Sequence, residues 1–301
     1  MTLQLGPLAL PLGPLALLVI LAATAWIAAR ASHPSDRMTV DGALWWSAAA
    51  GLLGARLAYL LRHLEVYRDH PLAALDIRDG GFLVLPGIAI AMLVLLWLMR
   101  TKPASRVRVI GIAVLGLSLW WSTSAVLQER SPVNRINLAS LGVPLLPVPL
   151  TPPTGSKADT DTDTDTDTDT DTDAVTASSL ASIAARTQAQ PMVVNLWATW
   201  CAPCRAEMPV FARAQASHPQ ITFVFANQGE TQAVIQAYLQ REGLALREIW
   251  LDPGSGLGRA VGSSALPTTL FFDVHGRLVK VHLGMLSEAA LRVMLAPLSK
   301  P

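Results

Sequence analysis

The two cysteines of this 301-residue chain, Cys201 and Cys204, are separated only by Ala202 and Pro203, and the sequence contains no other cysteine. Two thiols this close in sequence can form one disulfide that is easily reversed. Such a pair is better suited to dithiol–disulfide exchange than to cross-linking a fold. The sequence therefore predicts redox chemistry at this Cys-x-x-Cys element.

The residues around the cysteines suggest how the pair would work. We expect Cys201 to lie at the start of a helix, where free backbone N–H groups and the helix dipole stabilise a thiolate. Cys201 would be the exposed attacking sulfur, and Cys204, one turn further, would resolve the mixed disulfide. Pro203 suits the first turn, where its missing N–H would be unpaired anyway. Trp197 and Trp200 are expected to pack around the site and shape its contact surface.

The composition indicates a membrane portion. The chain is 51% hydrophobic and only 15% charged, against about 25% charged residues in an ordinary soluble domain, and its mean hydropathy is +0.40. Long apolar runs fill the first 130 residues, whereas the rest reads as a soluble protein. The net charge of +1 gives no indication of a nucleic-acid partner.

Four segments are apolar enough, and close enough to about 20 residues, to span a bilayer as helices. They cover residues 8–29, 43–61, 82–99 and 107–127. The first could instead be a cleaved signal peptide, but this is the less favoured alternative because no Lys or Arg precedes it. The sequence therefore predicts a helical membrane domain of about four transmembrane helices.

Basic residues in the loops predict the orientation of these helices. Arg and Lys are concentrated around residues 30–40 and 100–108, which places both loops in the cytoplasm by the positive-inside rule. Both termini, and with them the cysteines, then lie outside the cytoplasm, where accessible disulfides persist. We expect a multi-pass protein of a bacterial inner membrane with its C-terminal domain in the periplasm.

The second and third apolar segments carry a family resemblance. Residues 54–59 (GARLAY), followed by Tyr67 and by 79–81 (DGG), resemble the early helices of prolipoprotein diacylglyceryl transferase. Where that family carries a His-Gly-Gly element, this chain has Leu85-Pro86-Gly87. A transferase needs a general base and anion-binding groups, so a degenerate scaffold serving as an anchor is the favoured interpretation.

Arg56 lies inside the second predicted span, where a buried arginine is costly and needs a partner or a water-filled cavity. One interpretation is a binding site for a lipid headgroup or another anion. The other is that the helix starts later and the side chain snorkels to the interface. The residues favour neither interpretation over the other.

The domain plan that follows is 1–130 for the membrane helices, 131–175 for a linker and 176–301 for the soluble domain. Residues 143–156 are rich in proline, and 159–173 alternate Asp and Thr without a break. Like charges at every second position and the lack of an apolar face predict an extended, disordered tether. A calcium-binding loop is disfavoured because such loops need ligands held by a defined turn.

The soluble domain alternates strand and helix patterns in the order βαβα and then ββα. The expected helices cover 178–186, 204–217, 232–241 and 287–295, and the expected strands cover 192–197, 221–226, 270–273 and 278–283. Ser287 is a plausible N-cap for the last helix.

This order of elements, with the cysteines between a strand and a helix, resembles the thioredoxin fold. Residues 195–209 (NLWATWCAPCRAEMP) and 266–269 (LPTT) resemble the TlpA/ResA/DsbE-like branch of membrane-tethered thiol–disulfide oxidoreductases. The resemblance implies an α/β thioredoxin-like domain that needs no cofactor and no resident metal. It also matches Pro267 to the family's cis-proline, which we favour over an ordinary loop proline because of the motif around Cys201. A cis X–Pro bond costs only about 0.5–1 kcal/mol, so a fold can hold it.

Two acidic residues are candidates for supporting roles. Asn195 stands where thioredoxin has a buried acid that accepts a proton from the resolving thiol, and Asn cannot titrate. Glu230 could supply that role, or it could simply be a charge at a helix N-terminus. Glu207 fits the family's C-x-x-C-x-x-E-x-P pattern, or it could simply support its helix.

The resemblance implies a disulfide reductase, for example in cytochrome c maturation or copper-centre assembly, acting on disulfide-containing extracytoplasmic proteins. Because the membrane half has no cysteine, electrons would come from a separate membrane thiol reductase of the DsbD/CcdA type. Two alternatives are copper handling by the cysteines with His218, His275 or His282, and lipoprotein diacylglyceryl transfer by the membrane half. Membrane lipid is the other expected partner.

Overall fold

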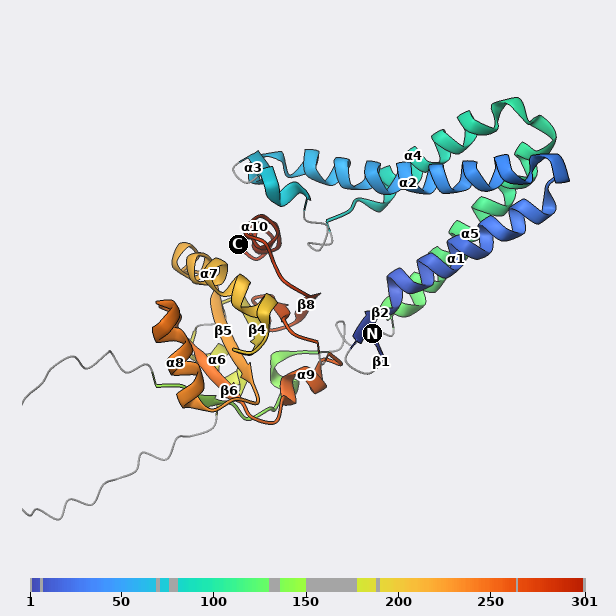
Figure 1. Ribbon diagram of the computed structural model, residues 1–301. Helices are drawn as coiled ribbons and strands as arrows, with labels where there is room; N and C mark the ends of the chain where they lie inside the picture. Colours follow the sequence, from blue (N-terminus) through green and yellow to red (C-terminus); the bar gives the residue numbers. More distant parts are fainter. Residues whose placement is uncertain are drawn as a thin grey trace, which may run out of the picture. The chain divides into compact units, whose positions relative to one another are not determined.

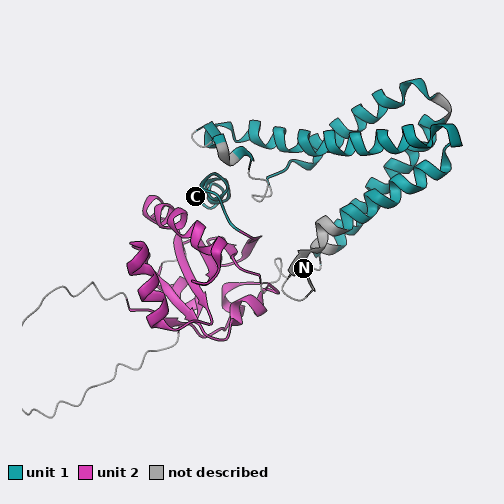
Figure 2. Cartoon of the chain, viewed as in Figure 1, with its two compact units in different colours: residues 1–135, 285–301 teal, residues 136–284 magenta. Residues whose placement is uncertain are grey.

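The computed structural model describes residues 2–5, 8–68, 71–75, 81–129, 136–149, 178–187, 190–263 and 265–299 (Figure 1). The chain forms two compact units (Figure 2). The helical unit comprises residues 1–135 together with 285–301, and the sheet unit comprises residues 136–284.

Four long helices build the helical unit, as the hydropathy predicts. They are α1 (Leu12–Ala31), α2 (Arg37–Arg62), α4 (Val84–Leu98) and α5 (Pro103–Glu129). Helix α2 packs against α4, and α1 packs against α5. The shorter elements are β1 (Thr2–Leu5), β2 (Leu8–Pro11), α3 (Leu64–Arg68), α10 (Glu288–Leu295) and the 3-10 turns Pro34–Asp36, Pro71–Leu75 and Met99–Thr101.

Three helical segments in the described part are long and apolar enough to cross a bilayer: Pro34–Arg62, Val84–Thr101 and Ser105–Val126. The first expected span is also helical, but its described apolar stretch, Ala16–Ala31, is shorter. The predicted fold class, about four transmembrane helices followed by an α/β thioredoxin-like domain, is confirmed in its architecture, with three to four membrane-type helices in the described residues.

Small residues allow α2 and α4 to approach closely. A Cβ atom added at Gly51 of α2 would lie 2.9 Å from the carbonyl oxygen of Gly87 on α4. A Cβ atom added at Gly87 would lie 2.7 Å from the Cβ of Ala55. Close backbone contact of this kind is the usual basis of helix association in membranes, where apolar side chains gain little by leaving lipid.

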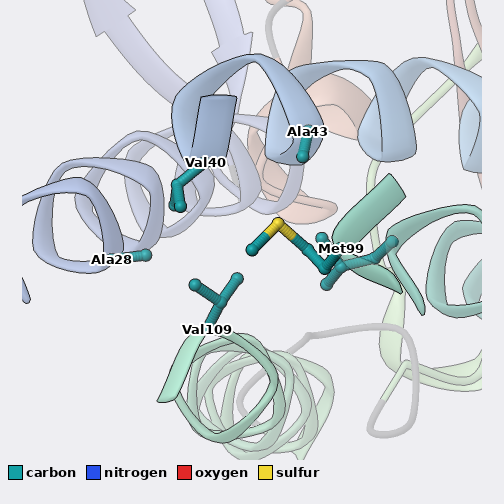
Figure 3. Close-up of a cluster of buried hydrophobic side chains, with 6 residues drawn as sticks. Ala28, Val40, Ala43, Met99 and Val109 are labelled. Atoms are coloured by element: carbon teal, nitrogen blue, oxygen red, sulfur yellow. The ribbon is translucent and has the colours of Figure 1, made fainter. Parts of the chain in front are cut away.

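The two basic loops lie at the same end of the helical unit. Asp36 accepts from Lys102 Nζ at 2.7 Å and from Ser105 Oγ at 3.0 Å, and Arg108 Nη1 donates to the Ala31 carbonyl at 3.0 Å. Near this end a buried cluster joins all four helices, with Ala28, Val40, Ala43, Leu95, Met99 and Val109 (Figure 3). Loops 30–40 and 100–108 share one end, as the positive-inside argument requires.

The surroundings of Arg56 contradict the interpretation that the helix starts later and the side chain snorkels, whereas the anion-binding interpretation stays a prediction. Helix α2 starts earlier than expected, at Arg37, and the Arg56 side chain is buried. Its Nε and Nη2 atoms donate to the Ala74 carbonyl at 3.3 and 3.0 Å, and Nη1 donates to the Gly81 carbonyl at 3.0 Å. The guanidinium therefore holds the segment between α3 and α4 against α2 and does not snorkel.

A six-stranded sheet forms the core of the sheet unit, in the order β3-β6-β5-β4-β7-β8. Strands β4 (Met192–Trp197), β5 (Thr222–Gln228) and β6 (Ile249–Asp252) are parallel. Strand β7 (Thr268–Phe272) pairs antiparallel with β4, and β8 (Leu278–Leu283) pairs antiparallel with β7. On the other side of the sheet, β3 (Leu146–Pro147) pairs antiparallel with β6.

Helices α6 (Leu180–Arg186), α7 (Ala202–Ser217), α8 (Gln232–Glu242) and α9 (Gly256–Ala260) connect these strands. The predicted helices and strands are all present, and Ser287 caps α10 by accepting from the Ala290 N–H. The sequence analysis missed β3, β6 and α9. The core is aromatic, and Phe211 of α7 packs edge-on against Phe223 and Phe225 of β5.

Residues 136–149, which we name the strap, run from one edge of the sheet to the other. At the β8 edge, Leu278 N–H donates to the Ile136 carbonyl at 3.1 Å and Leu138 N–H donates to the Gly276 carbonyl at 2.8 Å. At the opposite edge the strap forms β3 beside β6. Its buried side chains are Leu138, Leu141, Leu145 and Val148.

The strap corrects the predicted domain boundary. We expected 131–175 to be a linker, but residues 136–149 belong to the sheet unit because they hydrogen-bond to both of its edges. Residues 150–177 lie outside the described residues, so the expected conformation of the Asp-Thr repeat stays a prediction. At the other end of the expected domain, α10 groups with the helical unit and contacts α3.

Candidate redox site

The two cysteines lie where strand β4 passes into helix α7, as the sequence predicts. Cys201 is the N-cap of α7, and the Cys204 N–H donates to Cys201 Sγ at 3.3 Å. The pair forms a disulfide with an S–S distance of 2.10 Å. Cys201 is 5% exposed and Cys204 is fully buried. Cys201 is therefore less exposed in the disulfide form than expected, although the remaining exposed surface of the pair belongs to this residue.

The neighbouring side chains only partly match the expectation. Pro203 occupies the first turn of α7 and is exposed, which fits its missing N–H. Trp197 is fully buried and its ring lies 5.5 Å from that of Tyr238. Trp200 is 68% exposed, so it does not pack around the disulfide as predicted. An exposed indole beside Cys201 suits a contact surface instead, because aromatic rings supply large amphipathic contact area.

Pro267 lies at the same end of the sheet as the cysteines. The Leu266–Pro267 peptide bond is cis, as predicted. Thr268, the first residue of β7, pairs with Leu196 near the end of β4, and Cys201 follows β4 after a short turn. The register therefore brings Pro267 beside the turn that carries Cys201. The Pro267 carbonyl accepts from the Gly284 N–H at 2.9 Å.

Glu230 fixes the turn that precedes Cys201. Its Oε2 accepts from the Thr199 N–H and from Asn227 Nδ2, both at 2.7 Å, and its Oε1 accepts from Thr199 Oγ1 at 2.5 Å. The carboxylate thus receives three hydrogen bonds, two of them from the turn between β4 and α7. The sequence analysis did not single out Thr199 or Asn227, although an Asn three residues before a Glu after a strand suggests a side-chain-closed turn.

Glu207 and Asn195 form a buried polar contact behind Cys204. Glu207 is fully buried on α7, and Asn195 Nδ2 of β4 donates to its Oε1 at 2.8 Å. Asn195 Nδ2 also lies 3.2 Å from Thr269 Oγ1, opposite it on β7. Because residues three apart share a helix face, Glu207 faces the same interior as Cys204.

This arrangement can support thiol exchange. A thiolate at Cys201 would lie at the positive end of α7 with backbone N–H groups directed toward it. The buried Cys204 thiol needs a nearby group to accept its proton, and Glu207 is the acid on the same helix face. Among the described residues, no three His, Cys, Asp or Glu side chains gather into a potential metal site.

The fold and the site together define a thioredoxin-like redox domain attached to a helical membrane-type domain. The Redoxin family model matches residues 154–294. The prolipoprotein diacylglyceryl transferase family model matches residues 2–121. Both resemblances expected from the sequence are confirmed, and the second one covers more of the helical unit than the motif had indicated.

Individual relatives match about a third of the chain. Thiol-disulfide oxidoreductase ResA of Halalkalibacterium halodurans is 33% identical over 97 residues, which is 32% of this chain and 54% of that protein. Thiol:disulfide interchange protein HelX of Rhodobacter capsulatus is 32% identical over 106 residues, which is 35% of this chain and 59% of that protein. The chain thus spans just over half the length of these curated relatives.

Solved structures were also compared with the chain. A structure of MTB dsbF is 26% identical, with a TM-score of 0.34 and coverage of 37% of this chain and 82% of that one. A thiol:disulfide interchange protein of the thioredoxin family from Chlorobium tepidum is 25% identical, with a TM-score of 0.36 and coverage of 42% and 88%. The class expected from the sequence, a thioredoxin-type redox protein, agrees with the Redoxin family match and with the names of the ResA and HelX relatives.

Proposed function

We propose that this chain is a membrane-anchored thiol–disulfide oxidoreductase that reduces disulfides of extracytoplasmic proteins through Cys201 and Cys204. The observation that carries the proposal is the disulfide at the N-terminus of α7, with Cys204 fully buried and Cys201 5% exposed. An exchange enzyme needs this asymmetry, because one sulfur must meet the substrate while the other stays protected from it.

The proposed reaction transfers two electrons from the dithiol to the substrate. The Cys201 thiolate attacks one sulfur of the substrate disulfide, forms a mixed disulfide, and releases the other substrate sulfur as a thiolate. Cys204 then loses its proton and attacks Cys201 Sγ, which releases the second substrate thiolate and leaves the Cys201–Cys204 disulfide. The substrate gains two electrons and, from water or the protein, two protons.

We assign the proton transfer from Cys204 to Glu207, because both groups are fully buried one turn apart on α7. Asn195 is a positioning residue whose amide holds the Glu207 carboxylate. Glu230 is a positioning residue for the turn that precedes Cys201, since its carboxylate already receives three hydrogen bonds. Pro267 would direct the Leu266 backbone toward a bound substrate strand, and Trp200 would contact the substrate.

The direction of electron flow and the donor extend the proposal. We favour the reductase direction, with cytochrome c maturation as one process that needs such a protein. The names of two relatives, the thiol-disulfide oxidoreductase ResA and the thiol:disulfide interchange protein HelX, support thiol–disulfide exchange. The chain has only two cysteines, so the helical unit cannot relay electrons by disulfide exchange. A separate membrane thiol reductase of the DsbD/CcdA type would reduce the Cys201–Cys204 disulfide after each turnover.

The helical unit serves as the anchor in this proposal, in a bacterial inner membrane with the redox domain on the periplasmic side. Many apolar side chains of its long helices are exposed, among them Leu53 at 72% and Leu115 at 70%, and lipid would cover them. Transferase activity gains no support. At the place of the family's His-Gly-Gly element, α4 carries Leu85, an aliphatic side chain that is 71% exposed.

Trapping tests the proposal directly. Cys204→Ser in the full chain should accumulate mixed disulfides on Cys201 in cells, because the resolving thiol is gone. Cys201→Ser is the matched control and should trap nothing, since Cys204 is fully buried. Equal trapping by both variants, or by neither, would refute the assigned roles. Copper titration of the reduced protein addresses the alternative function, which tight stoichiometric binding would favour.

A further inference from the structure

One end of the helical unit carries an excess of positive charge. Helices α1 and α4 end there, and α2 and α5 begin there. We call it the basic end and define it by its six cations, Arg30, Arg37, Arg100, Lys102, Arg106 and Arg108. Its acids are Asp36 and Asp41, so six positive charges against two negative ones leave a net charge of +4. A concentration of one sign of charge attracts partners of the opposite sign.

The other end of the same helices shows no such excess among the described residues. Arg62 and Arg68 lie at that end together with Glu65 and Glu129, so positive and negative charges are equal in number. The charge asymmetry therefore runs along the helices, and the basic end is the one that attracts an anion.

Two of the six cations hold the loops of the basic end together. Lys102 pairs with Asp36 at 2.7 Å, and Arg108 Nη1 donates to the Ala31 carbonyl at 3.0 Å. In the described part of the chain, the other four cations have no acidic partner. They are Arg30, Arg37, Arg100 and Arg106, of which the first three are exposed. Guanidinium groups bind phosphate oxygens through parallel N–H donors, so these side chains suit an anionic phosphate ligand.

Tryptophan side chains hold two of these arginines at a defined depth. The guanidinium carbon of Arg30 lies 4.2 Å from the centroid of the Trp26 ring, and that of Arg100 lies 4.6 Å from the Trp97 ring. Both indoles are exposed on the surface of their helices. Exposed tryptophans of membrane helices lie at the level of the headgroups, and stacking on them directs each guanidinium toward that level.

We infer that the basic end is a binding surface for anionic phospholipids, on which Arg30 and Arg100 contact the lipid phosphates. The occupant is a lipid and not a soluble anion, because the indole stacked on each guanidinium needs apolar contact that acyl chains supply. Arg37 and Arg106 add attraction for the charge of the headgroup. The inference rests on the membrane anchoring within the proposed function and not on its thiol chemistry.

A lipid titration of the full chain in neutral-detergent micelles tests the inference. The probes are phosphatidylserine, phosphatidylglycerol and phosphatidylcholine, each with the same fluorescent acyl chain, and energy transfer from tryptophan reports binding. Each cation near a membrane surface contributes about fivefold to the affinity for anionic lipid, so both anionic lipids should bind at least about 25-fold more tightly than phosphatidylcholine. High salt should reduce this preference, because it screens exposed charges.

Charge variants locate the surface. Arg30→Gln combined with Arg100→Gln should lower the preference by about 25-fold, since two cations are lost. Arg62→Gln combined with Arg68→Gln is the matched control, because it removes the same charge from the other end, and it should leave the preference unchanged. Arg30→Lys combined with Arg100→Lys keeps the charge and should retain most of the preference, which separates a loss of charge from a loss of fold.

Three results would overturn the inference: equal affinity for all three lipids, equal losses in the two Gln variants, or a preference for phosphatidylglycerol alone. The third would indicate a headgroup-specific site elsewhere. Displacement of the labelled lipid by soluble glycerol phosphate as effectively as by unlabelled phosphatidylserine would refute a lipid occupant. Failure of the chain to float with vesicles would refute the anchoring instead, and a failed mixed-disulfide trap would refute the redox proposal without changing these titrations.

Discussion

Replacing Glu207 with Gln separates the chemistry of this side chain from its packing. Glu207 is fully buried, and its Oε1 accepts from Asn195 Nδ2 at 2.8 Å. Gln has nearly the same shape and keeps an oxygen for this hydrogen bond. Its new amide N–H can donate to Asn195 Oδ1, which is buried without a partner among the described residues. The substitution should therefore change stability by no more than about 1 kcal/mol.

The rate of mixed-disulfide resolution should fall much more. A positioned general base typically contributes about 10²- to 10⁴-fold to a proton transfer, so we expect resolution at pH 7 to slow by at least about 100-fold. This factor corresponds to about 2.7 kcal/mol in the barrier. Without Glu207, only the spontaneously ionised fraction of Cys204 can attack, and that fraction rises tenfold per pH unit below the thiol pKa.

The assay reacts the reduced protein with a small symmetric disulfide and follows release of the second thiol between pH 5 and 9. The variant should show a log-linear rise of rate with pH, whereas the unaltered chain should be less dependent on pH. Glu242→Gln, which removes an exposed carboxylate from α8, is the matched control and should behave as the unaltered chain. Equal resolution rates for Glu207→Gln and the control would refute the assigned role.

Three further predictions concern stability. Leu145→Ala should lower the free energy of unfolding of the sheet unit by about 2–5 kcal/mol, since the side chain is fully buried; an unchanged denaturation midpoint would contradict the role of the strap. Gly51→Leu should prevent α2 from packing on Gly87 and reduce recovery of folded protein in detergent, whereas Gly42→Leu, which has open space, should not. Asp273→Ala should destabilise the β7–β8 turn by about 1–3 kcal/mol at neutral pH, as measured by urea denaturation.

The pH dependence of the Asp273 contribution follows from its surroundings. Burial opposes ionisation, but hydrogen bonds from Arg277 and from the His275 N–H outweigh it and lower the pKa of Asp273 below its usual value of 3.8. A carboxyl whose pKa is lowered by folding stabilises the fold fully above its unfolded pKa. That stability is lost as the pH falls through the folded pKa. The difference between the unaltered chain and Asp273→Ala should therefore shrink below about pH 4, and a difference constant down to pH 2 would contradict the reasoning.

Strong local patterns made most of the sheet unit predictable from the sequence. The run Met192–Trp197 is apolar and β-branched, and it forms the fully buried central strand β4. The Ser-Glu pair at 287–288 marks the start of α10. Strand β6 has only four residues, Ile249–Asp252, between polar flanks. A run this short carries too little periodicity to be distinguished from a loop.

The strap was not predictable because its composition indicates a linker, whereas its long-range backbone pairing makes it part of the sheet unit. Residues 143–149 contain three prolines, which suggested a linker. Residues 146–148 pair with β6, about 100 residues later, and Ile136 and Leu138 pair with Leu278 and Gly276, about 140 residues later; nothing local reveals those pairings. The apolar residues Leu138, Leu141, Leu145 and Val148 recur every three to four positions, and this spacing was the available signal. The carbonyl partners of Arg56, at Ala74 and Gly81, were not predictable for the same reason, because backbone acceptors leave no mark in the sequence.

The positions of Asn195 and Glu207 suggest how the acid proposed to accept the Cys204 proton can lie on the helix instead of on the strand. Thioredoxin, which this domain resembles, has its buried acid on the strand, where this chain has Asn195. Here the carboxylate lies on α7, and the strand supplies the amide that donates a hydrogen bond to it. With the acid on α7, its spacing from Cys204 is set by the helix backbone, not by packing between helix and sheet. Small shifts of α7 on the sheet during exchange would then leave the spacing between Glu207 and Cys204 unchanged.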